Sequence, residues 1–132
     1  MNTLARYIDV MVEPTFQDFR REPSSRRAYL TCVAIYHGID RAADDRGISR
    51  GNLRKEWRKT IEFMLIDYAA HHFKHVKSTE DKIPADKLGL PLSFALGLGE
   101  DDEIGQLRNF SFVLRDAVKF LRQEPIRTNV PR

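Results

Sequence analysis

The stretch WRKTIEFMLIDYAAHHFKHV, residues 57–76, decides the fold. At about 100° per residue, one apolar stripe forms on a helical wheel, and it contains Trp57, Ile61, Met64, Leu65 and Tyr68. His71, His72 and His75 fall on the same side of the wheel. The spacing therefore predicts one continuous helix whose imidazoles extend the core-facing side.

Working outward, Gly- and Pro-containing segments punctuate the chain on both sides of this stretch. The segments between them carry helical periodicity, which predicts helices over about residues 3–20, 24–45, 50–76 and 103–123. Ser24 or Ser25 and then Ser49 are expected N-caps, and Gly47 is an expected helix stop. Pro14 predicts a kink or break in the first helix because it lacks an N–H and crowds the preceding turn.

Two of these helices have informative faces. In the helix over 24–45, one face holds Ala28, Cys32, Ile35, Ile39 and Ala42, and a second face holds Leu30, Val33 and Ala34. A helix that is apolar on two faces is expected at the centre of the fold. The helix over 103–123 has the cleanest amphipathic pattern, with Leu107, Phe110, Leu114, Ala117 and Leu121, and Asp101 or Asp102 as its expected cap.

These elements predict an all-α fold, an up-and-down bundle of four or five helices in a single domain covering 1–132. Residues 79–102 are too apolar for a disordered linker, so we expect an irregular packed loop there. A flexible tail is expected over 125–132.

Composition narrows the class of protein. The chain has 132 residues, 42% of them hydrophobic, which is enough for a buried core. Its single cysteine, Cys32, lies in an apolar context that favours a reduced, packed thiol in a cytoplasmic protein. The sequence has neither a signal-like N-terminus nor a run of about 20 apolar residues, so no membrane partner is expected.

The three clustered histidines raise the question of a metal site. Asp67, His71 and His75 are spaced by four residues, so one helix could direct two imidazoles and a carboxylate at one ion. The cluster lacks the Glu of an HExxH motif and has no cysteine pair. The alternative is a helix end, where imidazoles and lysines interact with unpaired carbonyls and the negative end of the dipole. We therefore expect no metal and no other cofactor.

Positive charge gathers between Arg20 and Lys59, where eleven Arg and Lys stand against five acids. Arg50, Arg54 and Arg58 form one row at steps of four, with Lys55 and Lys59 in a parallel row. Such rows could bind the phosphates of a nucleic acid. The alternative is a solvated helix face, because no known nucleic-acid-binding signature accompanies the charge.

The stretches VEPTFQDFRREPSSRRAYLTCVAIYHGIDRAADD and LRKEWRKTIEFMLIDYAAHHFKHVKS resemble a group of small bacterial and phage-associated helical proteins. These share a "VEP" helix, a "P-S-x-R" helix start and an "A-x-x-x-K-H" helix end. Their outline is similar to HEPN-type bundles, which include ribonucleases with an Arg, then four to six residues, and then a His. No histidine in this chain satisfies that rule. The resemblance thus implies a fold, and it points to Lys74 and His75 if a polar site exists.

The leading hypothesis for function is a non-enzymatic interaction protein, either a homodimer or a binder of another protein, tied to phage or mobile-element biology by resemblance. One alternative is a hydrolase. It would be either metal-dependent, through Asp67, His71 and His75, or a divergent ribonuclease that uses His75, Lys74 and an arginine such as Arg26. A nucleic-acid binder acting through the arginine row is the third hypothesis.

Overall fold

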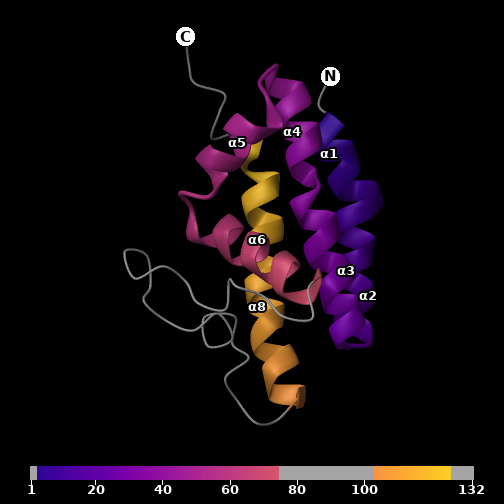
Figure 1. Ribbon diagram of the computed structural model, residues 1–132. Helices are drawn as coiled ribbons and strands as arrows, with labels where there is room; N and C mark the ends of the chain where they lie inside the picture. Colours follow the sequence, from indigo (N-terminus) through magenta and orange to yellow (C-terminus); the bar gives the residue numbers. More distant parts are fainter. Residues whose placement is uncertain (1–2, 75–102, 126–132) are drawn as a thin grey trace.

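The computed structural model describes residues 3–74 and 103–125, and in these ranges the chain is helical and contains no strand (Figure 1). The predicted all-α bundle is confirmed. The elements, in chain order, are α1 (Thr3–Tyr7), η1 (Ile8–Val12), α2 (Glu13–Arg21), α3 (Ser25–Tyr36), α4 (Gly38–Arg46), α5 (Arg50–Trp57), α6 (Ile61–Lys74) and α8 (Glu103–Arg122).

The first three elements run on as one rod in which η1 is a π-helix. The Glu13 N–H bonds to the carbonyl of Ile8, five residues back, and Pro14 follows at the start of α2. The interruption expected at Pro14 is therefore a wide turn placed just before the proline. Thr15 adds a side-chain bond there, because its hydroxyl donates to the carbonyl of Met11 at 2.6 Å.

The wide turn keeps the buried residues of the rod on one side of it. The buried residues of the rod repeat at steps of four, four, four and three: Leu4, Ile8, Val12, Phe16 and Phe19. In a regular α-helix each step of four overshoots a full turn by about 40°, so the stripe would wind around the rod. A π-turn holds more residues and returns the stripe to one side. All five side chains consequently face the same core.

The second predicted helix, 24–45, is divided in two by a turn at His37. Its start is as expected, because the Ser24 hydroxyl accepts a hydrogen bond from the backbone N–H of Arg27 at 3.1 Å. Its end is also as expected, because Gly47 adopts a left-handed conformation with φ 68°. The division leaves Gly38 against α8, where an added Cβ would lie 3.2 Å from Leu121 Cδ1.

The third predicted helix, 50–76, is not continuous, and this expectation is wrong. Ser49 does cap α5, since its hydroxyl accepts from the N–H of Asn52 at 3.1 Å. The chain then turns at residues 58–60, and α6 begins at Ile61. The apolar stripe drawn across the break is also wrong in part: Met64 is buried, but Ile61 is 39% exposed, and Phe63 takes the core position instead.

An aromatic cluster explains why the chain turns there. The rings of Trp57 and Phe63 lie 5.1 Å apart edge to face, and Phe120 of α8 meets Trp57 at 5.2 Å. Residues six apart point to different sides of a regular helix, so Trp57 and Phe63 could not touch in an unbroken one. Burying both rings in one core therefore requires the break.

The first of the two apolar faces of the predicted helix 24–45 lies in the core. Its five residues, Ala28, Cys32, Ile35, Ile39 and Ala42, are all buried. Burial raises the pKa of the Cys32 thiol, which keeps it protonated. The helix is central as expected, because α3 packs against η1, α2, α6 and α8, although Leu30 on its second face is 46% exposed. The predicted helix 103–123 corresponds to α8, whose Phe110, Leu114, Ala117 and Leu121 are buried.

Asp45 of α4 caps the start of α1 from 41 residues away in sequence. Its carboxylate accepts from the backbone N–H of Thr3 and of Leu4, both at 2.9 Å, and from the Thr3 hydroxyl at 2.7 Å. Burial acts to raise the pKa of Asp45, but these hydrogen bonds outweigh it and lower the pKa overall. The ionised form is thus favoured by folding.

This capping bond predicts a pH dependence of stability. Because the pKa of Asp45 is lower in the folded state, its contribution is present above the unfolded pKa of about 4 and is lost as pH falls through the folded pKa. The Asp45→Asn variant should therefore be less stable than the wild type at pH 7, and the difference should shrink below about pH 4. Urea titrations at several pH values measure this, and a constant difference would contradict it.

Candidate functional site

The predicted metal site falls partly outside the described residues. His75 lies outside them, and so do the side chains of His71, His72 and Lys74, although the backbone of the latter three belongs to α6. Asp67, the proposed carboxylate ligand, is fully buried. Among residues 3–74 and 103–125, no group of three His, Cys, Asp or Glu is placed to hold a metal ion.

Asp67 instead accepts from two arginines. Arg54 Nη2 lies 3.1 Å from both carboxylate oxygens, and Arg58 Nε lies 3.1 Å from Oδ2. In an unbroken helix Asp67 would lie about 20 Å from Arg54 along the axis. The turn at 58–60 folds α6 back and brings the three residues together. The carboxylate of Asp67 therefore forms ion pairs with Arg54 and Arg58, and this engagement argues against its proposed role as a metal ligand.

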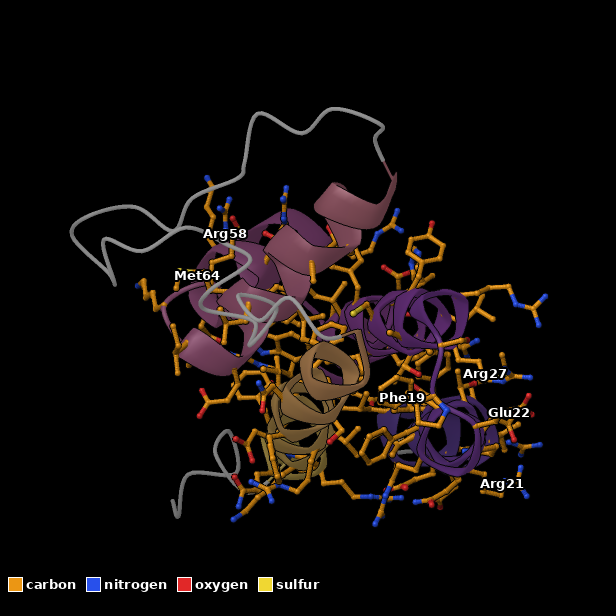
Figure 2. The ribbon with its side chains drawn as sticks, turned by 90° about the horizontal axis from the view of Figure 1, so that it is seen from below. Phe19, Arg21, Glu22, Arg27, Arg58 and Met64 are labelled. Carbon is orange, nitrogen blue, oxygen red and sulfur yellow. The ribbon has the colours of Figure 1, made fainter. Side chains whose placement is uncertain are left out.

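The arginines of the row that was expected to bind phosphates also form ion pairs with aspartates. Arg54 and Arg58 pair with Asp67, and Arg50 Nη1 lies 3.3 Å from Asp40 Oδ1. Each guanidinium therefore has a carboxylate beside it. Lys55 and Lys59 of the parallel row are exposed. Figure 2 places Arg58 on the side of the bundle away from Arg27.

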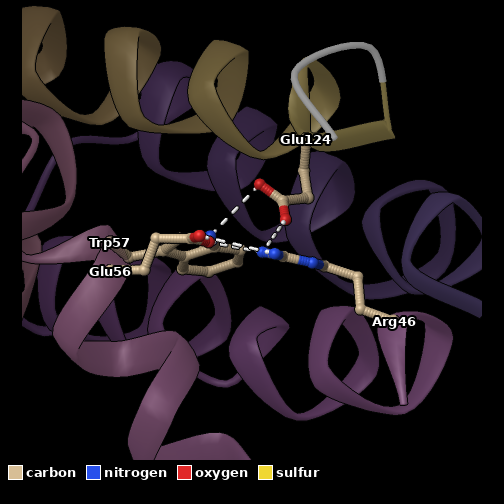
Figure 3. A network of polar contacts seen from close by, with 4 residues as sticks. All are labelled: Arg46, Glu56, Trp57 and Glu124. Carbon is tan, nitrogen blue, oxygen red and sulfur yellow. Dashed lines mark hydrogen bonds and ion pairs between the residues drawn. The ribbon is translucent and has the colours of Figure 1, made fainter. Parts of the chain in front are cut away.

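A second polar network joins α4, α5 and the residues just after α8 (Figure 3). The indole Nε1 of Trp57 donates to Glu124 Oε2 at 3.1 Å, and Arg46 Nη1 donates to Glu124 Oε1 at 3.3 Å. Arg46 also pairs with Glu56. The Glu56 hydrogen bond is the main cause that raises the pKa of the Arg46 guanidinium. Because the Glu124 side chain is only 4% exposed, this network fixes helices rather than presenting groups to a ligand.

One open feature of the described surface is a groove of about 570 Å³ between the first rod and α3. The rod contributes Tyr7, Met11, Thr15 and Asp18, each one residue before a buried member of the core stripe. The other wall consists of Arg26, Arg27, Leu30, Val33, Ala34 and His37. We call this feature the α2–α3 groove.

Two hydrogen bonds join the walls of the α2–α3 groove at its floor. The Tyr7 hydroxyl donates to the carbonyl of Ala34 at 2.7 Å, and the Thr31 hydroxyl donates to the carbonyl of Thr15 at 3.4 Å. Within α3, the Thr31 hydroxyl also donates to the carbonyl of Arg27 at 2.8 Å. Met11 and Leu30 remain 49% and 46% exposed above this floor. The groove thus offers a fixed apolar middle to solvent.

The two ends of the groove differ in charge. At the junction of α2 and α3, four arginines stand against two acids, and Figure 2 shows Arg21, Glu22 and Arg27 gathered there. Arg21 pairs with Asp18, and Arg27 Nη2 lies 3.5 Å from Glu22. At the far end, the aspartates of α4 are balanced by arginines, since Arg50 pairs with Asp40 and Arg41 lies over the Tyr7 ring at 5.6 Å. We call the first of these the basic end.

Among the catalytic candidates, Arg26 is the one whose side chain the structure describes, and it lies in the wall of the groove at its basic end. His37 lines the opposite end of the groove, with its Nδ1 3.6 Å from Asp40 Oδ2. The signal that could have found the groove was the second apolar face of the helix 24–45.

Comparisons with protein-family models, curated proteins and solved structures returned no match to this chain. Within the described ranges, no helix has the length and apolar character needed to cross a membrane.

Proposed function

We propose that the chain is a non-enzymatic interaction protein of the cytoplasm that forms a homodimer through the α2–α3 groove. The observation that carries this proposal is the pair of exposed apolar side chains, Met11 and Leu30, above a hydrogen-bonded floor. Apolar side chains grouped in a groove with charged ends are typical of protein interfaces.

The shape of the groove favours a helical partner. Its walls are two antiparallel helical segments whose outward residues recur at steps of three and four. Such ridges accept the ridges of another helix. Two copies that place these faces together bring four helices around one seam, an arrangement common among helix bundles. A homodimer therefore supplies the matching surface from the same sequence.

The competing functions draw less support from the described residues. A metal-dependent hydrolase would need Asp67, whose two oxygens are engaged by Arg54 and Arg58. A nucleic-acid surface would need arginines that are paired with carboxylates. The ribonuclease hypothesis, with His75, Lys74 and Arg26, rests on side chains of which the structure describes Arg26 alone. The HEPN-like identity and the link to phage biology stay proposals, supported by the resemblance and the all-α fold.

Sedimentation velocity across protein concentrations tests the proposed function. We expect a concentration-dependent dimer for the wild type, and Leu30→Asp should weaken the dimer by about 100-fold because a charge is placed in an apolar contact. Phe112→Asp is the matched control, since Phe112 is 50% exposed but lies on α8 outside the groove.

Two results would overturn the proposal. One is a wild type that stays monomeric at high micromolar concentration. The other is a dimer that tolerates Leu30→Asp but is lost in Phe112→Asp, which would move the interface to α8. Circular dichroism of both variants confirms that each remains folded.

A further inference from the structure

We infer that Met11 is an oxidation site: transfer of one oxygen atom from a peroxide to its thioether sulfur places a polar group in the α2–α3 groove and separates the two copies. This inference rests on the proposed dimer and adds a means of regulating it. It follows from the access of solvent to the sulfur atoms of the described residues and from the surroundings of Met11.

Three sulfur-containing side chains lie in the described ranges, and they differ in their access to solvent. Met11 is 49% exposed, whereas Met64 is 3% exposed and Cys32 is fully buried. Burial also raises the pKa of the Cys32 thiol, which keeps it protonated, and the thiolate is the reactive form of a cysteine. Among the side chains that the structure describes, a peroxide in solution therefore reaches the sulfur of Met11 first.

Met11 lies on the rod wall of the groove, between Tyr7 and Thr15. Its backbone carbonyl accepts a hydrogen bond from the Thr15 hydroxyl at 2.6 Å, which holds the backbone of the wide turn and leaves the thioether facing solvent. Leu30 on the other wall is exposed as well, so a second copy seated on the groove would bury both side chains against apolar atoms. A thioether suits such a contact because it is apolar and polarisable.

Oxidation changes this side chain from apolar to polar. A lone pair on the sulfur attacks one oxygen of hydrogen peroxide, the O–O bond breaks, and the other oxygen leaves as water after taking up the proton of the transferred oxygen. The sulfur is oxidised by two electrons and the peroxide is reduced by two, so one sulfoxide and one water form. Burying the sulfoxide oxygen in an apolar contact without a hydrogen-bond donor costs free energy. The dimer should respond rather than the fold, because Met11 lies outside the buried stripe of the rod.

The monomer is the form of the protein that reacts. A dimer formed through the groove would cover Met11, so the rate at which Met11 is oxidised should fall as the protein concentration is raised. Each oxidised chain is then withdrawn from the dimer, and reduction of the sulfoxide by a methionine sulfoxide reductase returns it.

Treating the full chain with dilute hydrogen peroxide tests the inference, with peptide mass spectrometry to locate the added oxygen and sedimentation velocity to measure the dimer. We expect Met11 to be oxidised at least about tenfold faster than Met64, and the oxidised protein to dimerise about tenfold more weakly. Circular dichroism should be unchanged, and treatment with methionine sulfoxide reductase should restore the dimer.

Three variants separate the sulfoxide from other effects of the oxidant. Met11→Leu keeps an apolar side chain without sulfur, so it should dimerise like the wild type both before and after peroxide treatment. Met64→Leu is the matched control, since it retains Met11 and should lose its dimer on oxidation as the wild type does. Met11→Gln has a polar side chain of similar length, and it should weaken the dimer without any oxidant.

An oxidised wild type that dimerises as tightly as the reduced protein would overturn the inference while leaving the proposed dimer intact. Oxidation of Met64 ahead of Met11 would do the same, and so would a Met11→Leu dimer that peroxide separates. A reduced wild type that does not dimerise would overturn the proposed function as well.

Discussion

Replacing Asp67 by Asn should destabilise the protein by about 2–4 kcal/mol, because removing one partner of a buried ion pair leaves uncompensated charge. Two guanidiniums converge on this fully buried carboxylate, those of Arg54 and Arg58. The expected cost is placed below the full value for a buried pair because both arginine side chains are 36% exposed. Water therefore screens part of their charge.

Urea unfolding followed by circular dichroism measures this loss. Asp116→Asn is the matched control, since Asp116 also pairs with an arginine, Arg115, but at the exposed surface. That control should change stability by less than about 0.5 kcal/mol. If the two variants lost equal stability, the charge of Asp67 would not hold α5 against α6.

Replacing Trp57 by Ala should cost about 3–5 kcal/mol, the range for deleting a large buried aromatic side chain. Trp57 is 2% exposed and packs against Phe63 and Phe120. Its indole also donates to the buried Glu124, so the variant leaves a carboxylate oxygen short of a hydrogen bond. Both effects destabilise the junction of α5, α6 and α8.

Thermal unfolding followed by circular dichroism measures the effect, because Trp57 is the only tryptophan in the chain and the variant has no indole fluorescence. Trp57→Phe separates the two causes, since it keeps an aromatic ring but removes the donor. It should lose less stability than Trp57→Ala. An equal loss in both variants would mean that the hydrogen bond to Glu124, rather than ring packing, dominates at this position.

The helix caps and the main core face could be predicted because they depend on residues close in sequence. Ser24, Ser49 and Gly47 act through hydrogen bonds and backbone angles within a few residues, and the structure places all three as expected. The face from Ala28 to Ala42 follows the helical repeat and is buried. Interactions between residues close in sequence were therefore sufficient to predict these features.

The break after Trp57 could not be predicted in that way. Residues 58–60 contain neither Gly nor Pro, and the helical pattern continues across them. The turn is favoured by contacts between residues on either side of it, namely the packing of Trp57 on Phe63 and the pairing of Arg54 with Asp67. Such contacts override local propensity.

The candidate site was missed for a related reason. The histidine spacing favoured a site at the end of α6, while the second apolar face of the helix 24–45 was expected to lie in the interior. Whether a face is covered depends on how many other elements reach it, and the described elements leave Leu30 half exposed. The arginine row was recognised, but its partners Asp40 and Asp67 lie on other helices and no local spacing indicates them.

The π-turn at Ile8–Val12 gives the rod one residue more than a regular α-helix needs between the same two core contacts. Deleting the exposed Val10 would leave regular α-helix, with the buried residues at steps of four, three, four and three. Leu4 and Ile8 would therefore keep facing the core, and Tyr7 would stay opposite Ala34. Natural variants of this chain should tolerate the loss of one residue within the turn but not in the regular α-helix on either side of it.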